Sequence, residues 1–122
     1  MPKPKKKPPD PFVQAVVMRL MPLGDVQARP MFGGHGIYVD GLFSALIMRD
    51  ALYLKADNHN RSVFEAGGAT PFRPYPDRPK PSMSYYKVPQ DVFDGPDLIP
   101  WAEGAVAAAR RSFKLKAASS RR

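Results

Sequence analysis

A glycine-rich segment is the first feature of this chain that could support chemistry. Gly33-Gly34-His35-Gly36 could bring backbone N–H groups close to an anion. Phosphate loops of this kind follow a strand and open a helix, whereas the alternating residues after Gly36 predict a strand. The segment also lacks the Gly-Lys-Ser/Thr ending and the Gly-x-Gly-x-x-Gly spacing of nucleotide-binding loops. We therefore expect a tight turn or a β-bulge at the start of a strand.

The remaining chemically capable residues do not form a recognisable catalytic or metal-binding pattern. His35 and His59 fall in different predicted elements, without the spacing of a metal-ligand pair. The serines lack a Gly-x-Ser-x-Gly elbow, and the aspartates within residues 91–97 surround Gly95-Pro96 and lead into a helix start. The chain has no cysteine, which excludes thiol chemistry. We predict no catalytic residue, no metal and no cofactor, and hence no enzyme.

The basic residues gather at the two ends of the chain. Overall, 19 Lys and Arg against 11 Asp and Glu give a net charge of +8, but all the acidic residues lie between Asp10 and Glu103. Basic ends of this kind attract phosphate without reading base sequence, although they could also serve only solubility. The residues predicted to contact DNA are Lys3, Lys5, Lys6, Lys7, Arg110, Arg111, Lys114, Lys116, Arg121 and Arg122.

Local signals predict a helix followed by antiparallel strands in the first half. Asp10-Pro11 is a typical helix start, and the helix should end near Met21. From Val26 the apolar period shortens to two, which indicates strands. Asp40-Gly41 predicts a two-residue type I′ hairpin turn. This turn would place Val39 opposite Leu42, Tyr38 opposite Phe43 and Ile37 opposite Ser44, with a second turn at Arg49-Asp50 before a third strand.

The second half predicts a short helix, a strand pair and a final helix. Asp57 or Asn58 should cap a helix through residues 62–64, which Gly67-Gly68 would end. Residues 70–75 and 82–88 predict two strands around a turn at 77–80, and prolines confine the first to an edge. Asp97 begins the last helix.

The predicted order α-β-β-β-α-β-β-α indicates an α+β fold in two layers. An antiparallel sheet of about five strands would carry helices packed on one face. We expect one domain over residues 10–111, preceded by a disordered basic arm at 1–9 and followed by a basic C-terminal tail at 112–122.

Three sequence blocks carry a family resemblance. They are Met31-Phe-Gly-Gly-His-Gly-Ile-Tyr-Val-Asp-Gly41, Leu52-Tyr-Leu-Lys-Ala-Asp57 and Met83-Ser-Tyr-Tyr-Lys-Val-Pro89. Their order resembles the N-terminal domain of the TfoX/Sxy family, whose founding members regulate bacterial competence genes, from about Phe12 to Arg111. The resemblance implies a small α+β fold and, at His35, an aromatic packing position, since relatives mostly carry tyrosine there. It also implies a second helical domain in full-length regulators, so we expect this chain to be a stand-alone N-terminal domain.

The predicted hairpin is apolar on both faces, although helices can cover only one. One face would hold Ile37, Val39, Leu42 and Leu46, and the other Tyr38, Phe43, Ala45 and Ile47. We predict that the second set contacts a partner or a second copy, unless the C-terminal segment folds over it. Tyr53 and Lys55 share the solvated face of a strand. The arrangement is compatible with nucleic-acid stacking, but a strand with one core face and one solvated amphipathic face is the preferred interpretation.

We therefore predict an accessory regulator of transcription or competence that acts by protein–protein contact, with weak non-specific DNA attraction by its tails. The alternative is a small dimeric adaptor with no DNA role. Neither a membrane nor a small molecule is an expected partner. Because no apolar signal segment follows the basic N-terminus, we expect a cytoplasmic protein.

Overall fold

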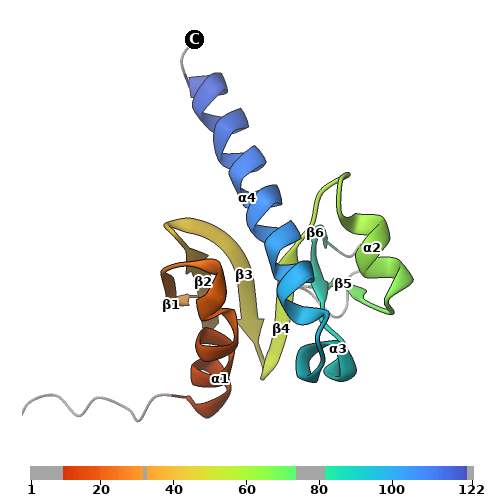
Figure 1. The fold of residues 1–122 in the computed structure, drawn as a ribbon. Coiled ribbons are helices and arrows are strands. Elements are labelled where there is room, and N and C mark those ends of the chain that lie inside the picture. The colour runs from red at the N-terminus through yellow and green to blue at the C-terminus, as the bar shows by residue number, and fades with distance from the viewer. Residues whose placement is uncertain (1–9, 32, 74–81, 121–122) are drawn as a thin grey trace, which may run out of the picture.

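A computed structural model describes residues 10–31, 33–73 and 82–120 of the chain (Figure 1). No helix among these residues combines the length and the apolar character needed to cross a membrane. The elements in chain order are α1 (Pro11–Leu20), the 3-10 turn η1 (Met21–Leu23), β1 (Val26–Met31), β2 (Gly34–Val39), β3 (Leu42–Met48), β4 (Ala51–Lys55), α2 (Arg61–Ala66), β5 (Thr70–Phe72), β6 (Ser82–Lys87), α3 (Gln90–Asp94) and α4 (Leu98–Ser120).

The first helix begins and ends as predicted. The Asp10 carboxylate accepts hydrogen bonds from the backbone N–H groups of Phe12 at 2.8 Å and Val13 at 3.4 Å. Pro11 occupies the first helical position, where a missing N–H is harmless. The helix ends at Leu20, before the 3-10 turn.

The strands form one six-stranded sheet in the order β1-β2-β3-β4-β6-β5, and every neighbouring pair is antiparallel. The α+β prediction is confirmed, with one strand more than the five expected. The additional strand is β1, whose Pro30 is tolerated because β1 lies at one edge of the sheet. As predicted, the proline-containing β5 lies at the other edge.

The two predicted hairpin turns are confirmed. Asp40 and Gly41 have φ of 50° and 82°, and Arg49 and Asp50 have φ of 52° and 59°, so each turn has positive φ at both central positions. Gly33, with φ of 80°, forms the tight turn predicted ahead of β2.

A β-bulge in β3 changes the side of the sheet on which the later side chains of the hairpin lie. Tyr38 pairs with Phe43 as predicted, but Ile37 pairs with Ala45, because the register shifts between Ile37 and Tyr38. Ser44 is the extra residue, and its hydroxyl donates to the Leu42 carbonyl at 2.9 Å. Both Ser44 and Ala45 are consequently buried.

Two residues predicted for the partner surface therefore belong to the core. Beyond the bulge, Ala45 and Ile47 lie across from Leu54 and Leu52 on the face that the helices cover. The prediction that Ala45 and Ile47 contact a partner is wrong, because one extra residue reverses the facing of every later side chain in a strand.

The core lies between this sheet face and the helices. Figure 1 shows α1 and α4 on the same face of the sheet. Phe64 of α2 packs against Tyr86 and Trp101, with ring centroids 6.1 and 5.0 Å away. The fully buried side chains with the largest volumes are those of Tyr86, Phe64, Leu20, Ile37, Leu52, Leu54, Leu98, Val16 and Val39.

Three further predictions need correction. The residue at the N-cap of α2 is Asn60, not Asp57 or Asn58. The short helix α3 was not predicted, and α4 continues to Ser120, so residues 112–120 form helical turns rather than a loose tail. Arg110 and Arg111 thus lie well inside the helix. The predicted basic arm at 1–9 and the turn at 77–80 lie outside the described residues.

Candidate functional site: two interaction surfaces

The sheet face opposite the core carries a group of aromatic rings. The Tyr38 and Phe43 rings are stacked, with centroids 5.2 Å apart and planes at 23°. Phe43 lies 6.0 Å from the Tyr85 ring, and Tyr53 meets Phe72 edge-on at 4.7 Å. All five rings are partly exposed. We call these five residues the aromatic face.

Strand pairing explains why these rings gather on one side. Tyr38 lies across from Phe43, and Lys55 lies across from Tyr85, so each pair shares a face. Because successive residues of a strand alternate between faces, Tyr53 joins Lys55 there. The adjacency of β4 and β6, which are distant in sequence, completes the cluster.

Cationic side chains lie against the outer rings of this face. The Arg29 guanidinium carbon is 4.8 Å from the Tyr38 ring centroid, and the Lys55 ammonium is 5.0 Å from the Tyr85 centroid. Lys87 lies across from Tyr53. Burial, followed by the charge of Lys116, lowers the pKa of the Lys55 ammonium. Burial also raises the pKa of the Tyr85 phenol. The face thus presents π-systems together with positive charge.

The second surface is the part of α4 that extends past the sheet. Figure 1 shows the last turns of the helix projecting beyond the strands. We call residues 110–120 the overhang. Phe113 and Leu115 on this segment are 64% and 70% exposed. Phe113 borders a hollow of about 280 Å³ that also touches Tyr38, Phe43 and Tyr85, and Leu115 borders one of about 300 Å³ beside Asp57.

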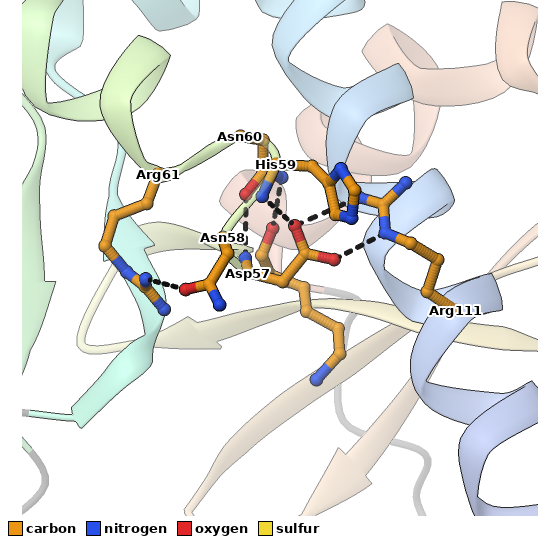
Figure 2. Close-up of polar contacts among 7 residues, drawn as sticks. Asp57, Asn58, His59, Asn60, Arg61 and Arg111 are labelled. Atoms are coloured by element: carbon orange, nitrogen blue, oxygen red, sulfur yellow. Dashed lines mark hydrogen bonds and ion pairs between the residues drawn. The ribbon is translucent and has the colours of Figure 1, made fainter.

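An ion pair fixes the overhang to the body (Figure 2). The Arg111 guanidinium donates to both carboxylate oxygens of Asp57, from Nε at 2.6 Å and from a terminal nitrogen at 3.0 Å. This hydrogen bond is the main cause that lowers the pKa of the Asp57 carboxyl, and it raises the pKa of Arg111. The bidentate geometry restrains both the position and the rotation of α4 at this point.

The loop that carries Asp57 is held by its own side chains. Asn60 accepts a hydrogen bond from the Asp57 N–H at 2.8 Å and donates to the Lys55 carbonyl at 3.1 Å. Asp57 in turn accepts from the His59 N–H at 2.9 Å, and Asn58 accepts from Arg61 at 2.7 Å. Because Asn60 is buried, the loop presents Asp57 to α4 in a fixed orientation.

Only some of the residues predicted to interact with a partner or with DNA lie on the surface in the described part of the chain. Tyr38 and Phe43 do lie on the exposed face, whereas Ala45 and Ile47 are buried. Arg111 is engaged by Asp57. The tail cations that remain exposed on α4 are Arg110, Lys114 and Lys116, and those that lie outside the described residues are Lys3, Lys5, Lys6, Lys7, Arg121 and Arg122.

One ring of the aromatic face and one cation beside it were not predicted from the sequence, whereas the histidines lie in separate elements as predicted. Arg29 and Phe72 were not recognised, although alternation along β1 would have placed Arg29 on the same side as Tyr38. His35 lies on β2 and His59 in the loop before α2, in separate elements as predicted.

Comparison with known families identifies the domain. The family model of the TfoX N-terminal domain matches residues 18–109 of the chain. The chain belongs to this family. The match spans α4 as far as Ala109 and every strand that contributes to the aromatic face of this TfoX N-terminal domain, while the overhang follows it. A comparison with curated proteins gives no match.

Proposed function

We propose that this TfoX N-terminal domain is an accessory regulator of transcription or competence that acts by contacting another protein, rather than by catalysis. Its family is associated with a competence or regulatory type of module. The proposal requires a surface that a partner can recognise, and the overhang is the best candidate for protein contact.

The exposure of Phe113 and Leu115 is the observation that carries the proposal. Exposure of large apolar side chains to water is unfavourable, and a partner that covers them lowers the free energy of the system. The hollow beside Leu115 offers depth for a partner side chain. The Asp57–Arg111 pair fixes the root of the overhang before binding, which lowers the entropy lost on association.

The exposed cations of the overhang add a second component. Arg110, Lys114 and Lys116 would attract duplex DNA without base specificity, with an affinity that falls steeply as salt is raised. In this proposal their role is to increase the local concentration of the domain near DNA, while the apolar residues provide the specific protein contact.

A matched pair of variants tests the protein contact. Phe113→Ser with Leu115→Ser removes the apolar side chains of the overhang. Met18→Ser with Met21→Ser is the control, since these residues are 70% and 60% exposed but belong to α1 and η1, which lie away from the last turns of α4 (Figure 1). Each variant is expressed in cells that lack the native gene, and transcripts are sequenced.

We expect the control to restore the native transcript levels and the overhang variant to fail. A photo-crosslinker at position 113, but not at position 18, should trap one protein, and mass spectrometry then identifies it. Restoration by both variants would contradict the proposal. A crosslink between two copies of the chain, together with a dimeric mass that the overhang variant loses, would instead favour the dimeric adaptor.

A further inference from the structure

We infer that the aromatic face is a binding site for single-stranded nucleic acid, with bases stacked along Tyr38, Phe43 and Tyr85 and phosphates held by Arg29, Lys55 and Lys87. This site rests on side chains other than Phe113 and Leu115, which carry the protein contact proposed for the overhang, although Phe113 borders the same hollow. Oligonucleotide binding and transcript restoration therefore test the two proposals separately. It also differs from DNA attraction by the basic ends, because it lies on the ordered sheet.

The arrangement of the rings is the first reason. Tyr38, Phe43 and Tyr85 follow one another across β2, β3 and β6, with centroid separations of 5.2 and 6.0 Å. Aromatic side chains on an uncovered antiparallel sheet are a general means of stacking two or three unpaired bases. Bases in a duplex are already stacked on one another, so such a row selects the single-stranded form.

The placement of charge is the second reason. Arg29 and Lys55 lie over the outer rings, at 4.8 and 5.0 Å from the centroids of Tyr38 and Tyr85. Lys87 adds a third cation across from Tyr53. Within the described strands, the residues that share this face by register include no aspartate or glutamate. A face with π-systems and cations, and with no carboxylate on its own strands, suits a ligand that has planar groups and repeated negative charge.

The hollow next to the face extends the same chemistry. Lys55 and Lys116 both line the cavity of about 280 Å³ that Tyr38, Phe43 and Tyr85 border. Their mutual repulsion contributes to the lowered pKa of Lys55. A phosphate between the two ammonium groups would relieve this repulsion, so the hollow is suited to the phosphate of a nucleotide whose base lies on the rings.

The same charges disfavour a second copy as the occupant. A two-fold dimer through this face would bring the two copies of the face, each with Arg29, Lys55 and Lys87, against each other. Like charges across an interface oppose association. Self-association through the face would therefore need counter-charges that its described residues do not provide.

Fluorescence anisotropy with labelled oligonucleotides tests the inference on the full chain. The probes are a 12-nucleotide oligo-dT, an oligo-U of the same length, a duplex, and poly-glutamate as an anion without bases. We expect both single strands to bind more tightly than the duplex or poly-glutamate. Tyr38→Leu and Tyr85→Leu should each weaken oligo-dT binding by roughly 5- to 150-fold, as expected for loss of one stacked base.

Conservative and charge variants separate stacking from attraction and from misfolding. Tyr38→Phe retains the ring and should bind like the unaltered protein, and circular dichroism must show that Tyr38→Leu remains folded. Lys87→Gln should lower the slope of log affinity against log salt by about 0.7. Arg110→Gln, a cation outside the aromatic face, and glutamine at Lys3, Lys5, Lys6 and Lys7 should leave the preference for single strands unchanged.

Three binding results would overturn the inference. They are equal affinity for the duplex and the single strand, poly-glutamate binding as tight as oligo-dT, and oligo-dT binding that is unaffected by both Tyr→Leu variants. A dimeric species that Tyr38→Leu abolishes would overturn it as well, because the face would then be occupied by a second copy.

Discussion

The ion pair between Asp57 and Arg111 should contribute measurably to stability. Its side chains are 27% and 36% exposed, so it lies between a surface pair and a buried pair. Surface pairs contribute about 0.2–1 kcal/mol, and breaking a buried pair costs about 3–5 kcal/mol. With two charged hydrogen bonds in bidentate geometry, we expect a coupling energy of about 1.5 kcal/mol at neutral pH.

A double-mutant cycle measures this coupling by urea denaturation. Asp57→Asn removes the charge but retains an oxygen that can accept from the His59 N–H, and Arg111→Met removes the guanidinium while retaining apolar volume. Arg110→Met is the control, since Arg110 is exposed next to the pair. The combined variant should be less destabilised than the sum of the single variants by the coupling energy.

The coupling should depend on pH in a defined direction. The pKa of the Asp57 carboxyl is lowered in the folded protein, mainly by the hydrogen bond from Arg111, whereas in the unfolded chain it lies near the ordinary value of about 3.9. The contribution is therefore complete above about pH 5 and declines as the pH falls through the lowered folded-state pKa. A coupling below about 0.3 kcal/mol at pH 7, or one that persists unchanged at about pH 2, would refute this reasoning.

Other predictions concern the hairpin and the helix–loop packing. Ile47→Ala should lower the unfolding free energy by about 3 kcal/mol and Leu46→Ala by about 1 kcal/mol, because the bulge puts Ile47 in the core; similar losses in urea would contradict that facing. Gly67→Ala should cost about 1–3 kcal/mol and lower the melting temperature, since an added Cβ would overlap the Trp101 ring. Asp40→Ala should cost about 1–2 kcal/mol and Asp40→Asn much less, because asparagine tolerates the positive φ and keeps an acceptor; equal urea midpoints would count against this.

The parts of the fold that could be predicted depend on local signals. The helix start at Asp10-Pro11 and the turn at Asp40-Gly41 are each determined by the residues at that position. Both could therefore be predicted without knowledge of distant parts of the chain. The five-strand prediction left out β1, whose Pro30 is acceptable in a strand only when that strand lies at an edge. Edge position is a property of the whole sheet, which the local sequence does not contain.

The bulge and the ion pair illustrate what local signals leave out. In the run 42–48, a serine at position 44 does not by itself indicate a β-bulge. The regular alternation of faces therefore assigned the residues after Ser44 to the wrong side of the sheet. Asp57 and Arg111 are 54 residues apart, and their pairing depends on how α4 crosses the sheet. The aromatic face likewise required the adjacency of β4 and β6, which is a matter of topology.

The extension of α4 past the sheet also gives the helix two unequal halves. Its inner half is fixed by close contact of Ala105 and Ala108 with the core, whereas its last turns extend past the strands and depend mainly on the intrinsic helix-forming tendency of their residues. Warming should consequently melt these outer turns well before the rest of the molecule unfolds. Such a segment can exchange between coil and helix at a small cost in free energy. Binding of a partner to it would therefore increase the helix content of the protein.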